Sequence, residues 1–188
     1  TWKDDHIGKL FVDSLANGKL KQEPTLLADI DADVPSKPHG GDEEWGFAPD
    51  GKIAYFTARL KGKTEAWSTN LDVYSVDLKS TQLSNLTADN QAMDTQPVAS
   101  PDGKSIAWLA MSKPMFESDK FRVMVRDLKS GLTRDISADL DRSLGSLQWS
   151  ADSKTLYGTA DDLGNHTLFS FDVKTAKATR IVDKGYVA

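Results

Sequence analysis

Cysteine is absent from the 188-residue sequence. A disulfide framework and a thiolate nucleophile are therefore both excluded, and the absence is compatible with an oxidising or a reducing compartment. Long apolar runs are also missing, so the sequence predicts no membrane-spanning segment, and the polar start at Thr1 lacks the basic-then-apolar order of a signal peptide. No Gly-x-Ser-x-Gly elbow, phosphate loop or dinucleotide fingerprint occurs. These absences predict a globular chain without a recognisable catalytic nucleophile.

A strongly basic surface and metal-ligand patterns are lacking as well. The chain has 28 acidic and 23 basic residues with both signs scattered, and its net charge of −5 argues against a nucleic-acid-binding face. Residues 29–33 (DIDAD) resemble the start of a calcium loop, but Val34 and Gly40 stand where such a loop needs glycine and glutamate. The three histidines are too far apart in sequence to form a zinc pair: His6, His39 and His166. We therefore expect no metal and no cofactor.

What the sequence does contain is a repeat. Residues 99–108 read ASPDGKSIAW, and the same pattern recurs as FAPDGKIAY at residues 47–55 and as WSADSKTLY at residues 149–157. Proline presets φ for a turn, and Asp-Gly tolerates the remaining turn dihedrals, so each copy predicts a hairpin between two apolar runs. The third copy lacks both proline and glycine, and Asp152 with Ser153 is expected to form a looser turn.

A second pair of strands follows each of these hairpins. Residues 71–87, 121–137 and 166–182 each give an alternating run, an Asp-aliphatic-Lys-Ser/Thr turn and another short run. Four short antiparallel strands that recur about every 45–50 residues are typical of a β-propeller blade. The alternative is three unrelated meanders in a β-sandwich, which the repeated turn chemistry disfavours. The predicted fold is all-β: a β-propeller arc of four-stranded antiparallel blades with TolB/WD40-like repeats.

This arc is an incomplete ring. Residues 43–87, 95–137 and 145–182 are the predicted blades, and residues 8–27 give only a strand, an Asn-Gly turn and a strand, which is half a blade. Propellers need about 4–8 blades to close. Residues 1–188 are therefore interpreted as a fragment of one propeller domain, whose unpaired ends are expected to favour self-association.

The connections between strands fall on two faces of the disc. The first and third connections of every blade are short turns, whereas the second connection and the crossover to the next blade lie on the other face. That face carries the irregular segments, which makes it the candidate functional face. They are residues 32–42, 59–70, 87–94, 111–120, 138–146 and 161–165.

Two of the irregular loops contain aromatic residues that are flanked by polar residues in the sequence. Trp67 lies in KTEAWSTN, and Met115 and Phe116 lie beside Glu117 in MSKPMFESDK. In one interpretation the aromatic side chains fill the gap between neighbouring blades and Glu117 is solvated. In the other, an apolar wall and a carboxylate form a pocket for a positively charged ligand.

Several longer stretches together resemble the N-terminal propeller of the prolyl oligopeptidase (S9) family of serine peptidases. They are PDGKIAYFTA, AWSTNLDVYSVDL, DTQPVASPDGKSIAWLAM, FESDKFRVMVRDLKSG and DRSLGSLQWSADSKTLYGTA, which cover nearly the whole chain. Pro-Asp-Gly-Lys alone is shared with TolB-type propellers, but the combination of AWSTN, DTQPV and FESDKFR is more specific. The branch with the greatest similarity is that of bacterial dipeptidyl-peptidase V and acylaminoacyl-peptidase-like enzymes.

The resemblance implies a C-terminal α/β-hydrolase domain as the partner of this propeller and a peptide as the substrate. It also implies that the Ser-Asp-His triad lies outside this chain, so that the fragment itself is not catalytic. In dipeptidyl peptidases of this family, propeller carboxylates bind the free amino terminus of the substrate. By loop position Glu117 matches this role, with Trp67, Asn70 and Phe116 as its neighbours.

The resemblance leaves the compartment and the function of the parent protein open. A periplasmic or secreted protein is the expectation, and a cytoplasmic one is compatible with the sequence. The rival hypothesis is a non-enzymatic TolB-type propeller that binds a protein partner on the irregular face. A Gly-x-Ser-x-Gly elbow downstream of Ala188 in the parent sequence would distinguish the two.

Overall fold

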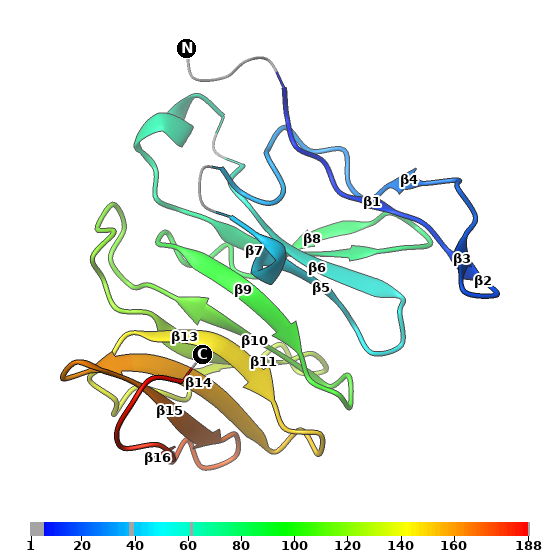
Figure 1. Ribbon diagram of the computed structural model, residues 1–188. Coiled ribbons are helices and arrows are strands. Elements are labelled where there is room, and N and C mark those ends of the chain that lie inside the picture. The colour runs from blue at the N-terminus through cyan, green and yellow to red at the C-terminus, as the bar shows by residue number, and fades with distance from the viewer. Residues whose placement is uncertain (1–5, 38–39, 61, 188) are drawn as a thin grey trace.

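The computed structural model describes residues 6–37, 40–60 and 62–187, and His39 lies outside them. Its three four-stranded antiparallel sheets follow one another along the chain and lie side by side in an open arc (Figure 1). Two short 3-10 helices, η1 (Asp42–Glu44) and η2 (Gly62–Trp67), interrupt the connections. The predicted all-β arc of four-stranded blades is confirmed. No helix in the described ranges is long and apolar enough to cross a membrane.

Each blade is a meander in which consecutive strands pair. The first blade consists of β5 (Trp45–Phe47), β6 (Ile53–Ala58), β7 (Asp72–Asp77) and β8 (Leu83–Asn85). The second consists of β9 (Asp94–Ala99), β10 (Ser105–Ala110), β11 (Arg122–Asp127) and β12 (Thr133–Asp135). The third consists of β13 (Leu144–Trp149), β14 (Thr155–Asp162), β15 (Asn165–Asp172) and β16 (Ala178–Arg180).

The repeated turns that join the first two strands of each blade have one geometry. Gly51 and Gly103 adopt φ values of 67° and 68°, and their amides donate to the carbonyl three residues earlier at 2.9 and 2.8 Å. Ser153 takes the same left-handed conformation with φ 60°, and its amide donates to Ser150 O at 3.0 Å. The third turn is therefore closed like the other two, rather than being looser as expected.

Apolar side chains fill the space between neighbouring blades. Tyr55 and Val73 of the first blade pack with Ile106 and Trp108 of the second, and all four are at most 5% exposed. A larger cluster joins the second blade to the third and includes the fully buried Phe171. Because alternate residues of a strand face opposite sides, the second blade contributes to both of these clusters.

Polar bonds also connect the blades, and three of them have main-chain carbonyl acceptors. Arg126 of the second blade donates to Leu86 O at 2.7 Å, in the segment that leaves the first blade. Arg134 donates to Val173 O of the third blade at 2.7 Å. Trp149 Nε1 donates to Val98 O at 3.0 Å, which joins the first strands of the second and third blades.

The N-terminal segment forms two strand pairs in place of a four-stranded blade. β1 (Phe11–Val12) pairs with β4 (Thr25–Leu26), and between them β2 (Leu15–Ala16) and β3 (Lys19–Leu20) form a hairpin that projects from the arc (Figure 1). Asn17 and Gly18 at its tip both have positive φ, of 52° and 75°. The following residues Leu27, Ile30 and Val34 pack on the outer face of the first blade.

Candidate functional site

Two of the predicted loops contact each other on the irregular face. η2 and the residues after it connect β6 to β7, and residues 111–121 connect β10 to β11. The amide of Met115 donates to the Thr69 hydroxyl oxygen at 2.8 Å, across 46 residues of sequence. The loops that carry the four predicted site residues are therefore neighbours.

The loop between β10 and β11 is held in shape by Asp119. This carboxylate accepts hydrogen bonds from the amide and hydroxyl of Ser112, at 2.7 and 2.9 Å, and from the amide of Lys113 at 3.0 Å. These bonds, the Ser112 amide above all, lower the pKa of Asp119 to about 2, so the carboxylate is charged at neutral pH. The sequence analysis missed both Asp119 and Thr69, because both act through contacts that span a loop or join two loops.

Three of the four predicted residues are accessible from solvent. Trp67 ends η2 and is 70% exposed, Phe116 is 47% exposed, and Glu117 is exposed beside it. The ammonium group of Lys113 lies 5.3 Å from the centre of the Phe116 ring. No ion pair within the described ranges involves Glu117, which is exposed.

Asn70, the fourth residue, lies below the surface. It is 2% exposed, and neither polar atom of its side-chain amide has a hydrogen-bond partner among the residues the structure describes. The main-chain amide of Asn70 donates to the Ser68 hydroxyl oxygen at 3.2 Å. Trp67, Phe116 and Glu117 are therefore exposed on neighbouring loops, whereas Asn70 is buried.

One segment that was expected to be irregular is a tight turn. β14 ends at Asp162 and β15 begins at Asn165, so only Leu163 and Gly164 connect the two strands. Both residues have positive φ. Residues 161–165 are therefore a regular two-residue turn with its flanking strand ends, and not an irregular loop. Asp162 at the end of β14 accepts hydrogen bonds from Arg142 Nε at 2.7 Å and from Arg180, and these two arginines lower its pKa.

The calcium-like stretch has another role in the structure. Asp33 accepts a hydrogen bond from the Gly8 amide at 2.6 Å and forms an ion pair with Lys37 at 2.9 Å, and these contacts fix the N-terminal segment. Within residues 6–37, 40–60 and 62–187 no group of three or more His, Cys, Asp or Glu side chains is arranged to hold a metal ion.

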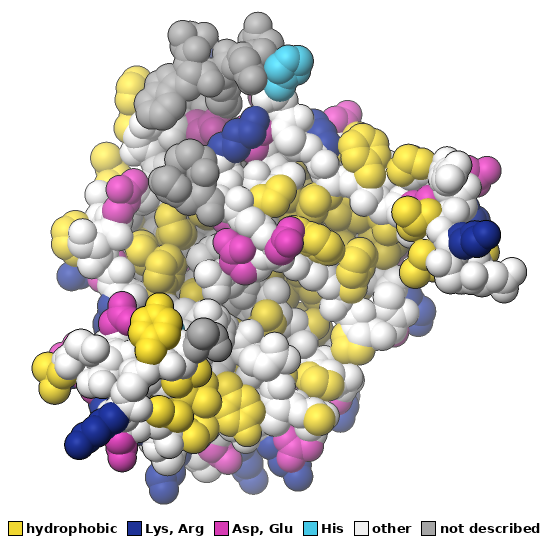
Figure 2. Space-filling model, in the orientation of Figure 1, with side chains coloured by type: hydrophobic (Ala, Val, Ile, Leu, Met, Phe, Trp, Pro, Cys, Tyr) yellow, Lys and Arg dark blue, Asp and Glu magenta, His cyan; other side chains and the backbone are white. Residues whose placement is uncertain are grey.

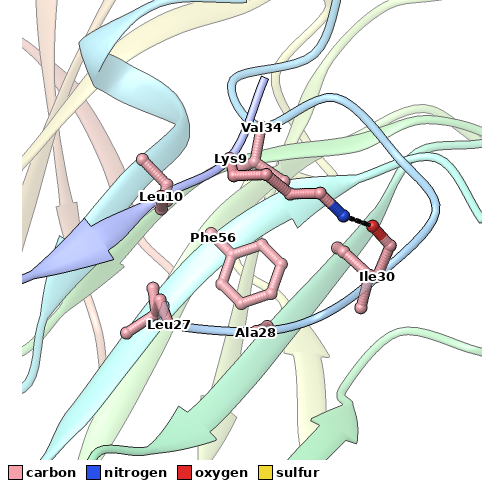
Figure 3. Close-up of a pocket in the computed structure, with 7 residues that line it drawn as sticks. All are labelled: Lys9, Leu10, Leu27, Ala28, Ile30, Val34 and Phe56. Carbon is pink, nitrogen blue, oxygen red and sulfur yellow. Dashed lines mark hydrogen bonds between the residues drawn. The ribbon is translucent and has the colours of Figure 1, made fainter. Parts of the chain in front are cut away.

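Neither hollow at the N-terminal segment has the form of a polar ligand site. The cavity in Figure 3 is lined by Leu10, Leu27, Val34 and Phe56 and roofed by Lys9, whose ammonium donates to Ile30 O. Its free volume of about 10 Å³ is at the limit of what one water molecule needs. A larger apolar groove, with a free volume of about 100 Å³, lies between β1 and β5, where Figure 2 shows exposed hydrophobic side chains.

Comparison with curated proteins identifies homologues of the chain. It is 33% identical over 172 residues to dipeptidyl-peptidase 5 of Porphyromonas gingivalis, an alignment that covers 91% of this chain and 25% of that protein. The chain is a β-propeller segment homologous to dipeptidyl-peptidase 5. The resemblance to the propeller of the prolyl oligopeptidase family is thereby confirmed. No family model matches the chain.

Solved structures agree on the fold. A putative TolB from Agrobacterium tumefaciens matches with a TM-score of 0.69 and 18% identity, over 94% of this chain and 56% of that chain. The S511A mutant of puromycin hydrolase matches with a TM-score of 0.65 and 16% identity, over 94% of this chain and 27% of that one. The chain spans about a quarter of the length of the dipeptidyl-peptidase 5 relatives it matches.

Proposed function

We propose that the chain is the substrate-binding part of a serine exopeptidase of the dipeptidyl-peptidase type. It helps to hold the amino terminus of a peptide and restricts the entry of large substrates to a hydrolase domain. The observation that supports this proposal is the hydrogen bond between the two loops, on which Trp67, Phe116 and Glu117 are each exposed to solvent. The name of the relatives supports the reaction class.

The chemistry of this surface suits a peptide amino terminus. A protonated amine that leaves water needs a compensating acceptor, and the Glu117 carboxylate offers a charge-assisted hydrogen bond. The indole of Trp67 and the ring of Phe116 provide apolar area for the first side chains of the peptide. Because Asp119 pre-organises the loop, less conformational entropy is lost when a ligand binds.

The partner of the propeller in this proposal is an α/β-hydrolase domain of the same polypeptide. A propeller that covers such a domain excludes folded proteins and bulk water from the reaction. A periplasmic or secreted location is part of the same proposal.

The purified chain is expected not to hydrolyse peptides or esters. Acyl transfer needs a nucleophile, a base and an oxyanion hole, and this sequence has no nucleophile elbow. The measurement is turnover of a dipeptidyl reporter by this chain and by the full-length parent in parallel. Release of dipeptides by the parent alone supports the proposal. Turnover by the isolated chain that a serine-directed inhibitor abolishes would contradict it.

A TolB-type adaptor is the second candidate function. It is favoured by the TolB likeness and by aromatic side chains on an exposed loop face, which also suit a protein partner. A parent without a nucleophile elbow downstream of residue 188, and without peptidase activity, would favour the adaptor.

The isolated chain is expected to self-associate through its apolar ends. Phe11, Leu15 and Leu20 are 61%, 70% and 61% exposed, and among the described residues β1 pairs only with β4, which leaves one of its edges unpaired. Light scattering over a wide concentration range should show dimers, and replacing both Leu15 and Leu20 by lysine should weaken them. The matched control is Leu163→Lys, at a 91% exposed leucine in the β14–β15 turn. A monomer at every concentration would contradict the expectation.

A further inference from the structure

The start of β9 links the two loops of the candidate site. The amide of Asp94 donates to Leu71 O at 2.8 Å, just after the loop that carries Trp67 and Asn70. The amide of Met111 donates to Met93 O at 2.8 Å, where the loop that carries Phe116 and Glu117 begins. A change in the backbone position of Met93 and Asp94 therefore affects the hydrogen bonds of both loops.

The side chain of Asp94 is buried in this joint between the first two blades. It is 1% exposed, and its Oδ1 accepts a hydrogen bond from Trp108 Nε1 at 2.7 Å. Its Oδ2 has no hydrogen-bond partner among the described residues. A buried carboxylate with one unsatisfied oxygen is unfavourable, whereas a protonated carboxyl needs less solvation.

None of the elements packed against β9 supplies a positive charge. These elements are η1, β5, β6, β7, β10 and β13, and none of them contains lysine or arginine. Their titratable residues are Asp42, Glu43 and Glu44 of η1, Tyr55 of β6, and Asp72, Tyr74 and Asp77 of β7. Two arginines lie at the ends of neighbouring strands. Arg59 follows β6, and Arg122 begins β11 and donates to Met111 O at 3.2 Å.

The surroundings favour the neutral form of the carboxyl. Burial above all, together with the charge of Asp72, raises the pKa of Asp94 from 3.8 to about 7, although Asn90, Trp108 and Thr87 partly oppose this shift. Between about pH 4 and pH 7 the group therefore mostly retains its proton in the folded chain, while in the unfolded chain it is mostly ionised.

We propose that Asp94 binds a proton inside the joint between the first two blades, and that loss of this proton loosens the two loops tied to Met93 and Asp94. This proton binding does not depend on a bound peptide, so its test is independent of the test of the proposed function. The two loops of the candidate site are therefore more ordered in acidic than in alkaline solution.

The sign of the effect on stability follows from proton linkage. Because the pKa of Asp94 is higher in the folded than in the unfolded chain, its stabilising contribution is complete below about pH 4 and is lost as the pH rises to about 7. Burial also raises the pKa of Glu44, which acts in the same direction. Asp102, whose pKa is lowered by its bonds to Ser100 and Lys104, titrates below this range.

The first test compares thermal unfolding of the wild type and Asp94→Asn. Asparagine retains an acceptor for Trp108 and replaces the protonated oxygen by an uncharged amide. The wild type should lose roughly 4–8 °C in Tm between about pH 5.5 and pH 8.5, and Asp94→Asn should lose less. Asp102→Asn is the matched control and should retain the wild-type slope. Parallel curves for the wild type and Asp94→Asn would overturn the proposal.

Two measurements on the wild type keep the proposal testable if Asp94→Asn fails to fold. The carboxyl carbon of Asp94, followed by NMR, should titrate near neutral pH, and a midpoint below about pH 5 would overturn the proposal. Hydrogen exchange should show about tenfold less protection of the Asp94 and Met111 amides above pH 7 than at about pH 6, after correction for intrinsic exchange. The Ile136 amide, which donates to Val123 O at 3.0 Å within the second blade, is the internal control. An equal loss of protection there would contradict a local effect.

Discussion

Glu117→Gln in the full-length parent is expected to lower kcat/KM for unblocked peptides by about tenfold to a hundredfold. Glutamine retains the shape of the side chain and removes its charge. A charge-assisted hydrogen bond to a protonated amine contributes roughly 1.5–3 kcal/mol, and about 1.4 kcal/mol corresponds to one decade in rate. If the amine is held equally in the ground and transition states, KM rises. If it also aligns the scissile bond, kcat falls as well.

Substrates with a blocked amino terminus provide the control for this experiment, because they present no positive charge to Glu117. The matched control variant is Glu23→Gln, at an exposed glutamate beside the projecting hairpin. Equal losses for free and blocked substrates would show that Glu117 merely supports its loop. No loss for either substrate would return Glu117 to the role of a solvated surface residue.

Phe171→Ala is expected to lower the free energy of unfolding by about 3–5 kcal/mol, the usual range for a buried phenylalanine. The ring is fully buried in the cluster between the second and third blades, where Trp149 and Leu156 surround it. Alanine would leave a cavity that a joint between two rigid sheets closes only in part. Denaturant unfolding followed by the intrinsic fluorescence of the tryptophans measures the change.

Phe11→Ala is the matched substitution for that measurement, because it removes the same ring from a side chain that is 61% exposed. It should cost less than about 1 kcal/mol. A similar loss for Phe171→Ala and Phe11→Ala would show that the cluster between the blades does not dominate the stability of the arc.

The repeat made the fold predictable. Each copy of the turn and of the strand pair after it satisfies its main-chain hydrogen bonds locally, so the sequence pattern reports the structure directly. Ser153 could be aligned with Gly51 and Gly103 from the repeat, but its left-handed backbone could not be expected from serine alone. The tight turn at Leu163 and Gly164 was missed because residues 161–165 were judged by their position in the repeat instead of their own Gly-containing turn chemistry.

The candidate site was predictable only in part. Aromatic residues in polar loops identified Trp67 and Phe116, and both are exposed in the structure. The burial of Asn70 and the bond between Met115 and Thr69 depend on how one blade sits on the next, which is not encoded in any local pattern. Likewise, only the packing reveals that the six elements in contact with β9 contain no lysine or arginine.

The bonds between blades have an evolutionary consequence. Arg126, Arg134 and Trp149 donate to carbonyl oxygens, and every residue type has a carbonyl oxygen. Substitutions at Leu86, Val173 or Val98 therefore leave the acceptor in place as long as the backbone path is kept. At these three bonds a blade can diverge in sequence without a matching change in its neighbour, whereas the bond from the Asp102 amide to the Ser153 hydroxyl oxygen at 3.0 Å requires a hydroxyl side chain there.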